Sequence, residues 1–147
     1  MGRIKGYTMI ELIIVLALFA LLLSISYPTL GIVNNYKEFQ ELKEFKRDVL
    51  FARNQAIVNN KVYSCIIDYP NNGYIINTEG KNIKKYNFQY GVKLIDNAGA
   101  VRLFTFGGNG VPLKTGTIRV DLDSKNNYYY LTVTPVIGKI SLKEVRD

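Results

Sequence analysis

Residues 5–23 read KGYTMIELIIVLALFALLL, and this stretch decides the fold of the chain. It places one carboxylate, Glu11, inside an apolar run that is otherwise free of charge, directly behind a short basic leader. A carboxylate inside a membrane-spanning helix costs about 2.5–3.5 kcal/mol, so such residues are usually kept for a function. The run from Tyr7 to Tyr27 has about 21 residues, close to the roughly 20 that cross a bilayer as a helix. The sequence therefore predicts a membrane-spanning helix that begins near Tyr7.

The order of residue types around Gly6 is specific: a basic residue, glycine, an aromatic, threonine, two apolar residues and glutamate. This order resembles the class III signal of type IV prepilins and pseudopilins. The resemblance implies that a prepilin peptidase cuts between Gly6 and Tyr7, that Tyr7 is then N-methylated, and that Glu11 is the assembly carboxylate. The family more often has Phe at the position of Tyr7, and an aromatic ring is retained here.

Two other interpretations of this segment stay open. A secretory signal also has a basic start and an apolar centre, and Ser24-Ile25-Ser26 has the small residues of a cleavage site. An uncleaved membrane anchor explains the apolar run but gives no role to Gly6, Thr8 or Glu11. In every version Arg3 and Lys5 are expected to stay on the cytoplasmic side and the body of the protein to lie outside, by the positive-inside rule.

The proposed role of Glu11 has a physical basis. Cleavage would create a positively charged amine at Tyr7, and in low dielectric this amine can form a charge-assisted pair with Glu11 of a neighbouring subunit. The alternative is that Glu11 neutralises its own amine, four residues away on the same helix face. The resemblance implies the intermolecular pairing, whereas the spacing does not decide between the two.

The composition limits the function classes. With 147 residues, the chain fits one domain besides the membrane segment, and its net charge of +7 falls by two when Arg3 and Lys5 leave with the leader. The chain has no histidine, which excludes His-based catalysis and His–metal sites. Its single cysteine, Cys65, cannot form an internal disulfide, so stability must come from packing. We expect no enzyme activity and no cofactor.

Beyond the apolar run the pattern stays helical as far as Asn59-Asn60. Pro28 removes a backbone hydrogen bond and is expected to kink the helix. Apolar residues then recur at spacings of three and four, which indicates an amphipathic stripe: Phe39, Leu42, Phe45, Val49, Ala52 and Ala56. The opposite face is expected to be an exposed mixed-charge surface, with Lys37, Glu38, Glu41, Lys43, Glu44, Arg47 and Asp48.

After Asn60 the pattern is typical of strands. Pro70-Asn71-Asn72-Gly73 is a strong turn signal between the first two. The expected strands are 61–69, 74–78, 83–89, 92–95, 101–106, 117–122, 128–134 and 139–145. Strands that all follow one long helix favour an antiparallel sheet packed on that helix. The predicted fold class is α+β, with a leader at 1–6, an assembly helix at 7–28, an amphipathic half at 29–60 and a β-rich extracytoplasmic head at 61–147.

Three further segments make the resemblance to type IV pilins and pseudopilins more specific. They are Ala52-Arg53-Asn54-Gln55-Ala56-Ile57 at the helix exit, the glycine-rich run 104–110 with the strand that follows it, and Gly138-Lys139-Ile140 in the last hairpin. Together they resemble minor pilins of the GspH/FimT type.

Other motifs favour structural roles. Cys65 lies in a strand pattern and is expected to be a buried thiol. Gly107-Gly108-Asn109-Gly110 lacks the Lys-Ser/Thr ending of a phosphate loop and is expected to be a hairpin turn. The run 121–126 begins like a calcium loop, but Lys125 occupies a ligand position and the glycine is missing, so no metal is expected. Residues 128–130 are consecutive tyrosines, which places rings on both sheet faces.

Basic residues near the C-terminus carry one binding hypothesis. Lys139 and Lys143 fall on one face of the last expected strand, and Arg146 follows in the tail. Some FimT-like minor pilins bind DNA through a basic C-terminal region, and a phosphate-binding patch would depend strongly on salt. The alternative is an ordinary solvated face, since Glu144 and Asp147 dilute the charge and aromatic–basic interleaving is not obvious in the sequence.

The sequence thus predicts a minor subunit of a type IV pilus or secretion pseudopilus. It would be a single-pass protein of the cytoplasmic membrane before assembly and part of a surface filament afterwards, where it primes or caps the filament. Its expected partners are prepilin peptidase, the inner-membrane assembly platform and other major and minor pilins. The competing prediction is a subunit whose main task is DNA uptake.

Overall fold

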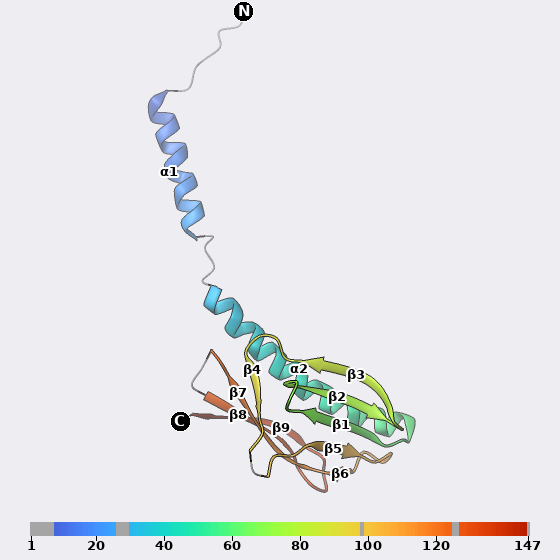
Figure 1. Cartoon of the computed structure of the whole chain (residues 1–147). Coiled ribbons are helices and arrows are strands. Elements are labelled where there is room, and N and C mark those ends of the chain that lie inside the picture. Colours follow the sequence, from blue (N-terminus) through green and yellow to red (C-terminus); the bar gives the residue numbers. More distant parts are fainter. Residues whose placement is uncertain (1–7, 26–29, 98, 125–126, 147) are drawn as a thin grey trace, which may run out of the picture. The chain divides into compact units, whose positions relative to one another are not determined.

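The computed structural model describes residues 8–25, 30–97, 99–124 and 127–146 (Figure 1). The chain divides into two compact units, one that ends at Val33 and one that begins at Asn34.

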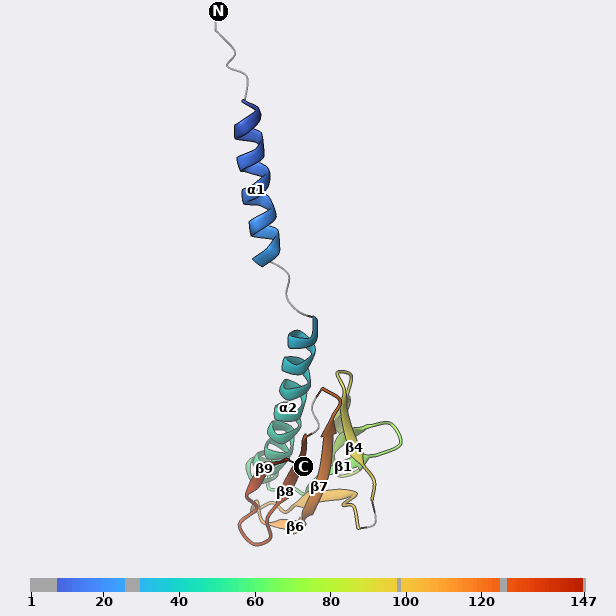
Figure 2. The same ribbon diagram turned by 90° about the vertical axis from the view of Figure 1, so that its left-hand side faces the viewer.

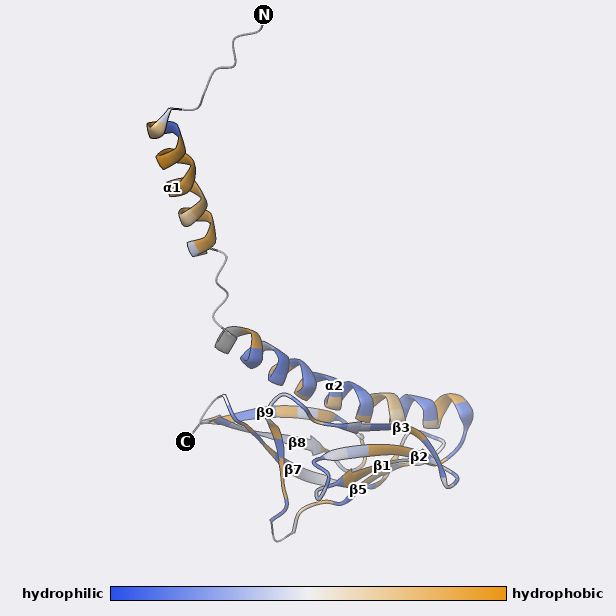
Figure 3. Ribbon diagram, turned by 45° about the horizontal axis from the view of Figure 1, so that its top comes forward, coloured by the Kyte–Doolittle hydropathy of each residue, from blue (hydrophilic) through white to orange (hydrophobic). Residues whose placement is uncertain are grey.

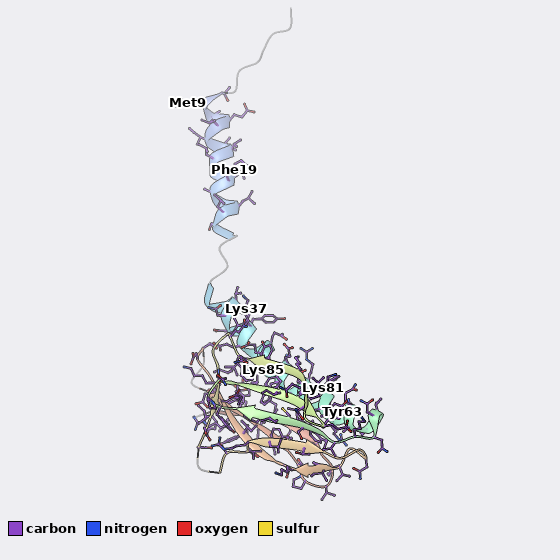
Figure 4. All side chains as sticks on the ribbon, turned by 45° about the vertical axis from the view of Figure 1, so that its right-hand side comes forward. Met9, Phe19, Lys37, Tyr63, Lys81 and Lys85 are labelled. Carbon is purple, nitrogen blue, oxygen red and sulfur yellow. The ribbon has the colours of Figure 1, made fainter. Side chains whose placement is uncertain are left out.

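Helix α1 (Met9–Ile25) makes up most of the first unit. Thr8 caps it: the Thr8 Oγ1 accepts from the Glu11 N–H at 3.4 Å, and the Thr8 carbonyl accepts from the Leu12 N–H at 3.3 Å. The helix is apolar on nearly every side, as the hydropathy colouring in Figure 3 shows, and Figure 4 shows Met9 and Phe19 standing away from it. A helix that is apolar all round needs apolar surroundings.

Within the described residues, no helix has both the length and the hydropathy that a bilayer crossing requires.

Helix α2 (Leu30–Asn59) carries the amphipathic stripe. It ends where Asn60 takes a positive φ of 50° and the Lys61 N–H donates back to the Ala56 carbonyl at 3.2 Å, a common way to close a helix. The predicted end near Asn59-Asn60 is confirmed. Pro28, the predicted kink, lies outside the described residues.

The strands of the second unit form two antiparallel sheets. The first has the order β3-β2-β1-β5-β6 and the second β4-β7-β8-β9. Strands β7, β8 and β9 lie side by side in Figure 2. The bounds are β1 Tyr63–Asp68, β2 Gly73–Thr78, β3 Lys81–Asn87, β4 Val92–Ile95, β5 Leu103–Phe106, β6 Pro112–Lys114, β7 Gly116–Leu122, β8 Asn127–Val133 and β9 Ile140–Arg146.

The predicted fold class, a long helix with an antiparallel head, is confirmed. The eight predicted strands are present, with ends that differ by a few residues. Strand β6 and the division into two sheets were not predicted. The turn at 70–73 and the hairpin turn at 107–110 are confirmed, the latter joining β5 to β6.

The core lies between α2 and the inner faces of both sheets. The predicted stripe supplies the helix side of it, and Phe45 stacks on Tyr74 with ring centroids 4.6 Å apart. Cys65 is fully buried, as predicted, and burial raises the pKa of its thiol. Among the described residues, the buried apolar side chains all lie between Leu42 and Val133. The core that the structure describes therefore lies in the second unit.

The predicted exposed charged face of α2 is wrong in part. Glu38, Glu41 and Asp48 are buried, at 4%, 4% and 9% exposure. The two sheets and the loops after β3 and β7 enclose more of the helix than the apolar stripe, so carboxylates beside the stripe are covered too. The cost of their burial is offset by hydrogen bonds to the head. Lys37, Lys43 and Arg47 are exposed, as predicted.

Candidate assembly segment and basic surface of the head

Glu11, the predicted assembly carboxylate, lies exposed in the first turn of α1. Gly6 and Tyr7, the predicted cleavage and methylation sites, lie outside the described residues. Thr8 and Glu11 occupy the N-cap and third helical positions, the Thr-x-x-Glu spacing of a capping box. A carboxylate there also favours the positive end of the helix dipole. Glu11 therefore has a local role in starting the helix, besides any role in assembly.

The buried carboxylates of α2 bind the helix to the head. Glu41 accepts from the Tyr86 hydroxyl at 2.7 Å and from the backbone N–H groups of Gln89 and Tyr90 at 2.9 and 3.0 Å. Glu38 accepts from the backbone and hydroxyl of Ser124. These bonds tie α2 to strand β3, to the loop before β4 and to the loop after β7.

Asp48 also attaches α2 to the head. Its carboxylate lies 2.7 Å from the Lys84 Nζ and accepts from the Tyr74 hydroxyl. Burial lowers the pKa of Lys84, but hydrogen bonds to Asp48 and Glu44 outweigh it and leave that pKa raised. Burial, followed by the bond to Asp48, raises the pKa of the Tyr74 hydroxyl. The ammonium and the neutral phenol are thus the forms that the folded head favours.

Arg53 connects the three segments on which the narrower resemblance rests. Its Nε donates to the Gly110 carbonyl and its Nη2 to the Ile137 carbonyl, both at 3.1 Å. A side chain at Gly110 would meet the Ile57 side chain at 2.6 Å, and one at Gly138 would meet the Arg53 Nε at 3.1 Å. The helix exit, the glycine-rich turn and the last hairpin therefore meet at one end of the head.

Of the predicted basic residues, Lys139 and Lys143 are exposed. Lys139 directly precedes β9, and Lys143 pairs with Tyr130 across the sheet. Within the part of the chain that the structure describes, neither lysine takes part in an ion pair. Arg146 ends β9, opposite Asn127, and its side chain is outside the description. The structure thus brings two of the three predicted residues to the outer side of the second sheet.

Aromatic–basic interleaving, which the sequence did not reveal, is present across the strands. Arg119 of β7 pairs with Tyr130 of β8, and Tyr130 pairs with Lys143 of β9. The Arg119 guanidinium also lies 4.1 Å from the centre of the Tyr128 ring, and Asp121 holds it by two bonds of 2.7 and 3.1 Å. Cross-strand register, not spacing along the chain, creates this arrangement. Tyr129 points the other way and is buried, as alternation predicts.

The described residues contain no group of three or more side chains suited to hold a metal ion. In the run that begins like a calcium loop, Asp121 pairs with Arg119 and Asp123 lies 2.6 Å from the Lys93 Nζ. Both carboxylates are therefore occupied by cations of the head itself.

Known proteins resemble this chain in two regions, its N-terminal segment and its head. Residues 1–27 match the family described as "Prokaryotic N-terminal methylation motif". No curated protein matches the chain. Among solved structures, the type IV minor pilin FimU of Pseudomonas aeruginosa is similar in two crystal forms. The P21 form has a TM-score of 0.56 at 21% identity, over 74% of this chain and 92% of that one.

The P65 form of FimU gives a TM-score of 0.53 at 19% identity, over 69% and 88% of the two chains. The minor pseudopilin EpsH from the Type 2 Secretion System of Vibrio cholerae gives 0.55 at 12% identity, over 73% and 96%. At these identities the likeness is one of fold. The chain therefore combines an N-terminal methylation motif with a head that has the fold of these minor pilins and pseudopilins.

Proposed function

We propose that this pilin-like chain is a minor pilin or pseudopilin of the GspH/FimT type that prepilin peptidase processes and that then enters a filament. The observation that carries the proposal is the methylation motif over residues 1–27, which includes a helix that is apolar on nearly every side. Cleavage after Gly6 removes the basic leader, and Tyr7 receives the methyl group. The head, which has the fold of minor pilins and pseudopilins, supports the same function.

The exposed apolar surface of α1 gives a physical reason for assembly. Before assembly, the cytoplasmic membrane covers this surface, and Arg3 holds the leader on the cytoplasmic side. After extraction by the inner-membrane assembly platform, helices of other pilins cover it. Glu11 at the start of α1 pairs with the amine of Tyr7 in a neighbouring subunit and sets the axial position of the incoming chain. As a minor subunit the protein primes or caps the filament, with its head outside the cell.

The test is incorporation into sheared surface filaments of the native cell. We expect the wild-type chain to co-purify with other pilins, and Glu11→Ala to be processed normally but lost from the filament fraction. Glu11→Asp serves as the matched control, because it keeps the negative charge at this position and shortens the side chain by one methylene. Normal incorporation of Glu11→Ala would overturn the assembly role of this carboxylate.

A second candidate function is DNA binding for uptake, through Lys139, Lys143 and Arg146. The observation that favours it is the cross-strand row Arg119, Tyr130 and Lys143, since cations next to aromatic rings suit phosphates and bases. Lys139→Glu with Lys143→Glu is expected to weaken DNA binding and flatten its salt dependence, with filaments intact. Lys81→Glu with Lys85→Glu, on exposed lysines of β3 (Figure 4), is the charge-matched control. Equal DNA binding by both double variants would reject this function.

A further inference from the structure

Exposed aliphatic side chains lie on two hairpins that Arg53 joins, in the turn of one and on a strand of the other. Val136 and Ile137, between β8 and β9, are 83% and 68% exposed, and Leu113 of β6 is 62% exposed. Large apolar side chains standing together in water are uncommon on monomers and mark contact surfaces. We call Leu113, Val136 and Ile137 the apolar tips.

The hairpin that carries Val136 is strained. Val136 has a φ of 69°, and the Ile137 N–H donates to the Pro135 carbonyl at 2.8 Å across it. This is a γ-turn in its rare, strained form. A β-branched residue at positive φ is a genuine outlier, and glycine would fit the position without strain. Strain of this kind persists where a side chain is kept for a function.

The two hairpins are also held rigidly. The Thr134 N–H donates to the Lys139 carbonyl at 2.9 Å, and the Gly138 N–H donates to the Thr134 carbonyl at 3.0 Å. Arg53 binds carbonyls of both hairpins, and a side chain at Gly138 would lie 3.2 Å from Pro112. The apolar tips are therefore presented by a fixed scaffold that α2 supports, and they need no rearrangement to make a contact.

Basic residues outnumber acidic ones at the end of the head that carries the apolar tips. The segments that build this end of the head, residues 52–64, 107–118 and 134–143, contain Arg53, Lys61, Lys114, Lys139 and Lys143 and no Asp or Glu. Lys61 pairs with Glu79 of the turn after β2. Lys114 and Lys139 are exposed and, within the described residues, have no ion pair.

We propose that this end of the head binds an anionic lipid surface. Val136, Ile137 and Leu113 enter the boundary between headgroups and acyl chains, and Lys114 and Lys139 contact the anionic headgroups. Exposed aliphatic side chains with lysines nearby are suited to bind a bilayer surface. Burial of the apolar side chains and attraction of the lysines to anionic lipids then act together. A protein partner would have to offer a recess with an acidic rim to fit the same tips.

The contact lies within the second unit. The chain enters this unit at Asn34, whereas Arg53 and the apolar tips lie at the end of α2 near Asn59. The rise between these ends of α2 is roughly 38 Å at 1.5 Å per residue. Every residue named in this contact belongs to the second unit, and so does the core that the structure describes, so residues 34–147 can be tested alone.

The experiment is co-sedimentation of residues 34–147 with vesicles of phosphatidylcholine, with or without phosphatidylglycerol. Circular dichroism first verifies that the fragment and each variant are folded. We expect binding to the vesicles with phosphatidylglycerol, little binding to phosphatidylcholine alone, and weaker binding as salt rises. Absence of binding to the anionic vesicles at low salt would overturn the proposal and leave a protein partner as the occupant.

Variants separate insertion from simple charge attraction. Val136→Ser with Ile137→Ser is expected to lower the affinity for anionic vesicles at least tenfold, and Lys114→Glu with Lys139→Glu by a similar factor. Leu50→Ser, which removes a partly exposed leucine from the outer side of α2, is the control and should bind like the wild type. If the Val136/Ile137 variant binds like the wild type, the apolar tips do not insert and the proposal fails.

Discussion

Arg53 of α2 donates from its Nη2 to the carbonyl of Ile137 at 3.1 Å, across 84 positions of the chain. The same guanidinium donates from its Nε to the carbonyl of Gly110. One side chain on the helix thus fixes two hairpins from different sheets. A side chain at Gly138 would meet the Arg53 Nε at 3.1 Å, so glycine at that position leaves room for the arginine.

Replacement of Arg53 by Ala should therefore loosen both hairpins. Hydrogen bonds from a charged donor contribute about 1.5–3 kcal/mol when buried, and partial exposure reduces this, so we expect a loss of about 1–2 kcal/mol in the free energy of unfolding. Urea unfolding of the head measures it. Arg47→Ala, on the exposed side of the same helix, should change stability by less than about 0.5 kcal/mol. Equal losses in the two variants would mean that Arg53 does not act as a link.

The Asp48 attachment should be the most sensitive of the helix–head contacts. Asp48→Ala leaves the buried Tyr74 hydroxyl without its acceptor and removes one of the two carboxylates beside Lys84. We expect a loss of about 2–3 kcal/mol in the free energy of unfolding. Glu44→Ala removes the other, more exposed carboxylate and should cost less than about 1 kcal/mol. Thermal and urea unfolding of both variants decide whether burial sets the difference.

Alkaline pH should destabilise the head through two hydrogen-bonded phenols, the buried Tyr74 and the partly buried Tyr86. Burial and the bond to Asp48 raise the pKa of Tyr74, and burial and the bond to Glu41 raise the pKa of Tyr86. A group with a folded pKa above its unfolded value contributes stability below the unfolded pKa, about 10 for tyrosine, and loses it as pH rises further. The raised pKa of Lys84 acts in the same direction.

Tyrosinate absorbance tests this expectation. At about pH 11 the native head should show fewer ionised tyrosines than the urea-unfolded head. Tyr74→Phe and Tyr86→Phe should each reduce that difference. Identical titration curves for native and unfolded protein would contradict the hydrogen-bonded placement of both phenols.

Replacement of Val136 by Gly should stabilise the head. The positive φ of Val136 costs of order 1–3 kcal/mol, and the entropy of glycine in the unfolded chain recovers part of this, so we expect a net gain of about 1 kcal/mol. Val111→Gly, on the neighbouring hairpin, is the control and should be neutral or destabilising, because Val111 is not among the described residues with positive φ. A loss of stability in Val136→Gly would show that the turn is not strained.

Much of this fold could be predicted from local patterns. Spacings of three and four located the buried side of α2 because a helix repeats every 3.6 residues, and alternation located most strands. The sequence did not predict strand β6, because Pro112–Lys114 is too short to show alternation and is defined only by its pairing with β5. The burial of Glu38 and Glu41 was not predicted either, because the loops that cover them come from distant parts of the sequence.

The candidate site also combines features that the sequence reveals with features that it does not. The spacing of Thr8 and Glu11 is visible in the sequence, because a capping box is local. The link through Arg53 and the row of Arg119, Tyr130 and Lys143 depend on tertiary contact and strand register. No pattern along the chain reveals which residues of separate strands become neighbours.

Mass spectrometry of the N-terminus, on protein purified from native membranes, is the decisive test of prepilin processing. We expect a chain that begins at Tyr7 and carries one added methyl group. A chain that keeps residues 1–6 in cells with active prepilin peptidase would contradict processing, and with it the filament function. Cleavage near Ser26 would contradict it as well, because α1 would then be removed from the mature protein.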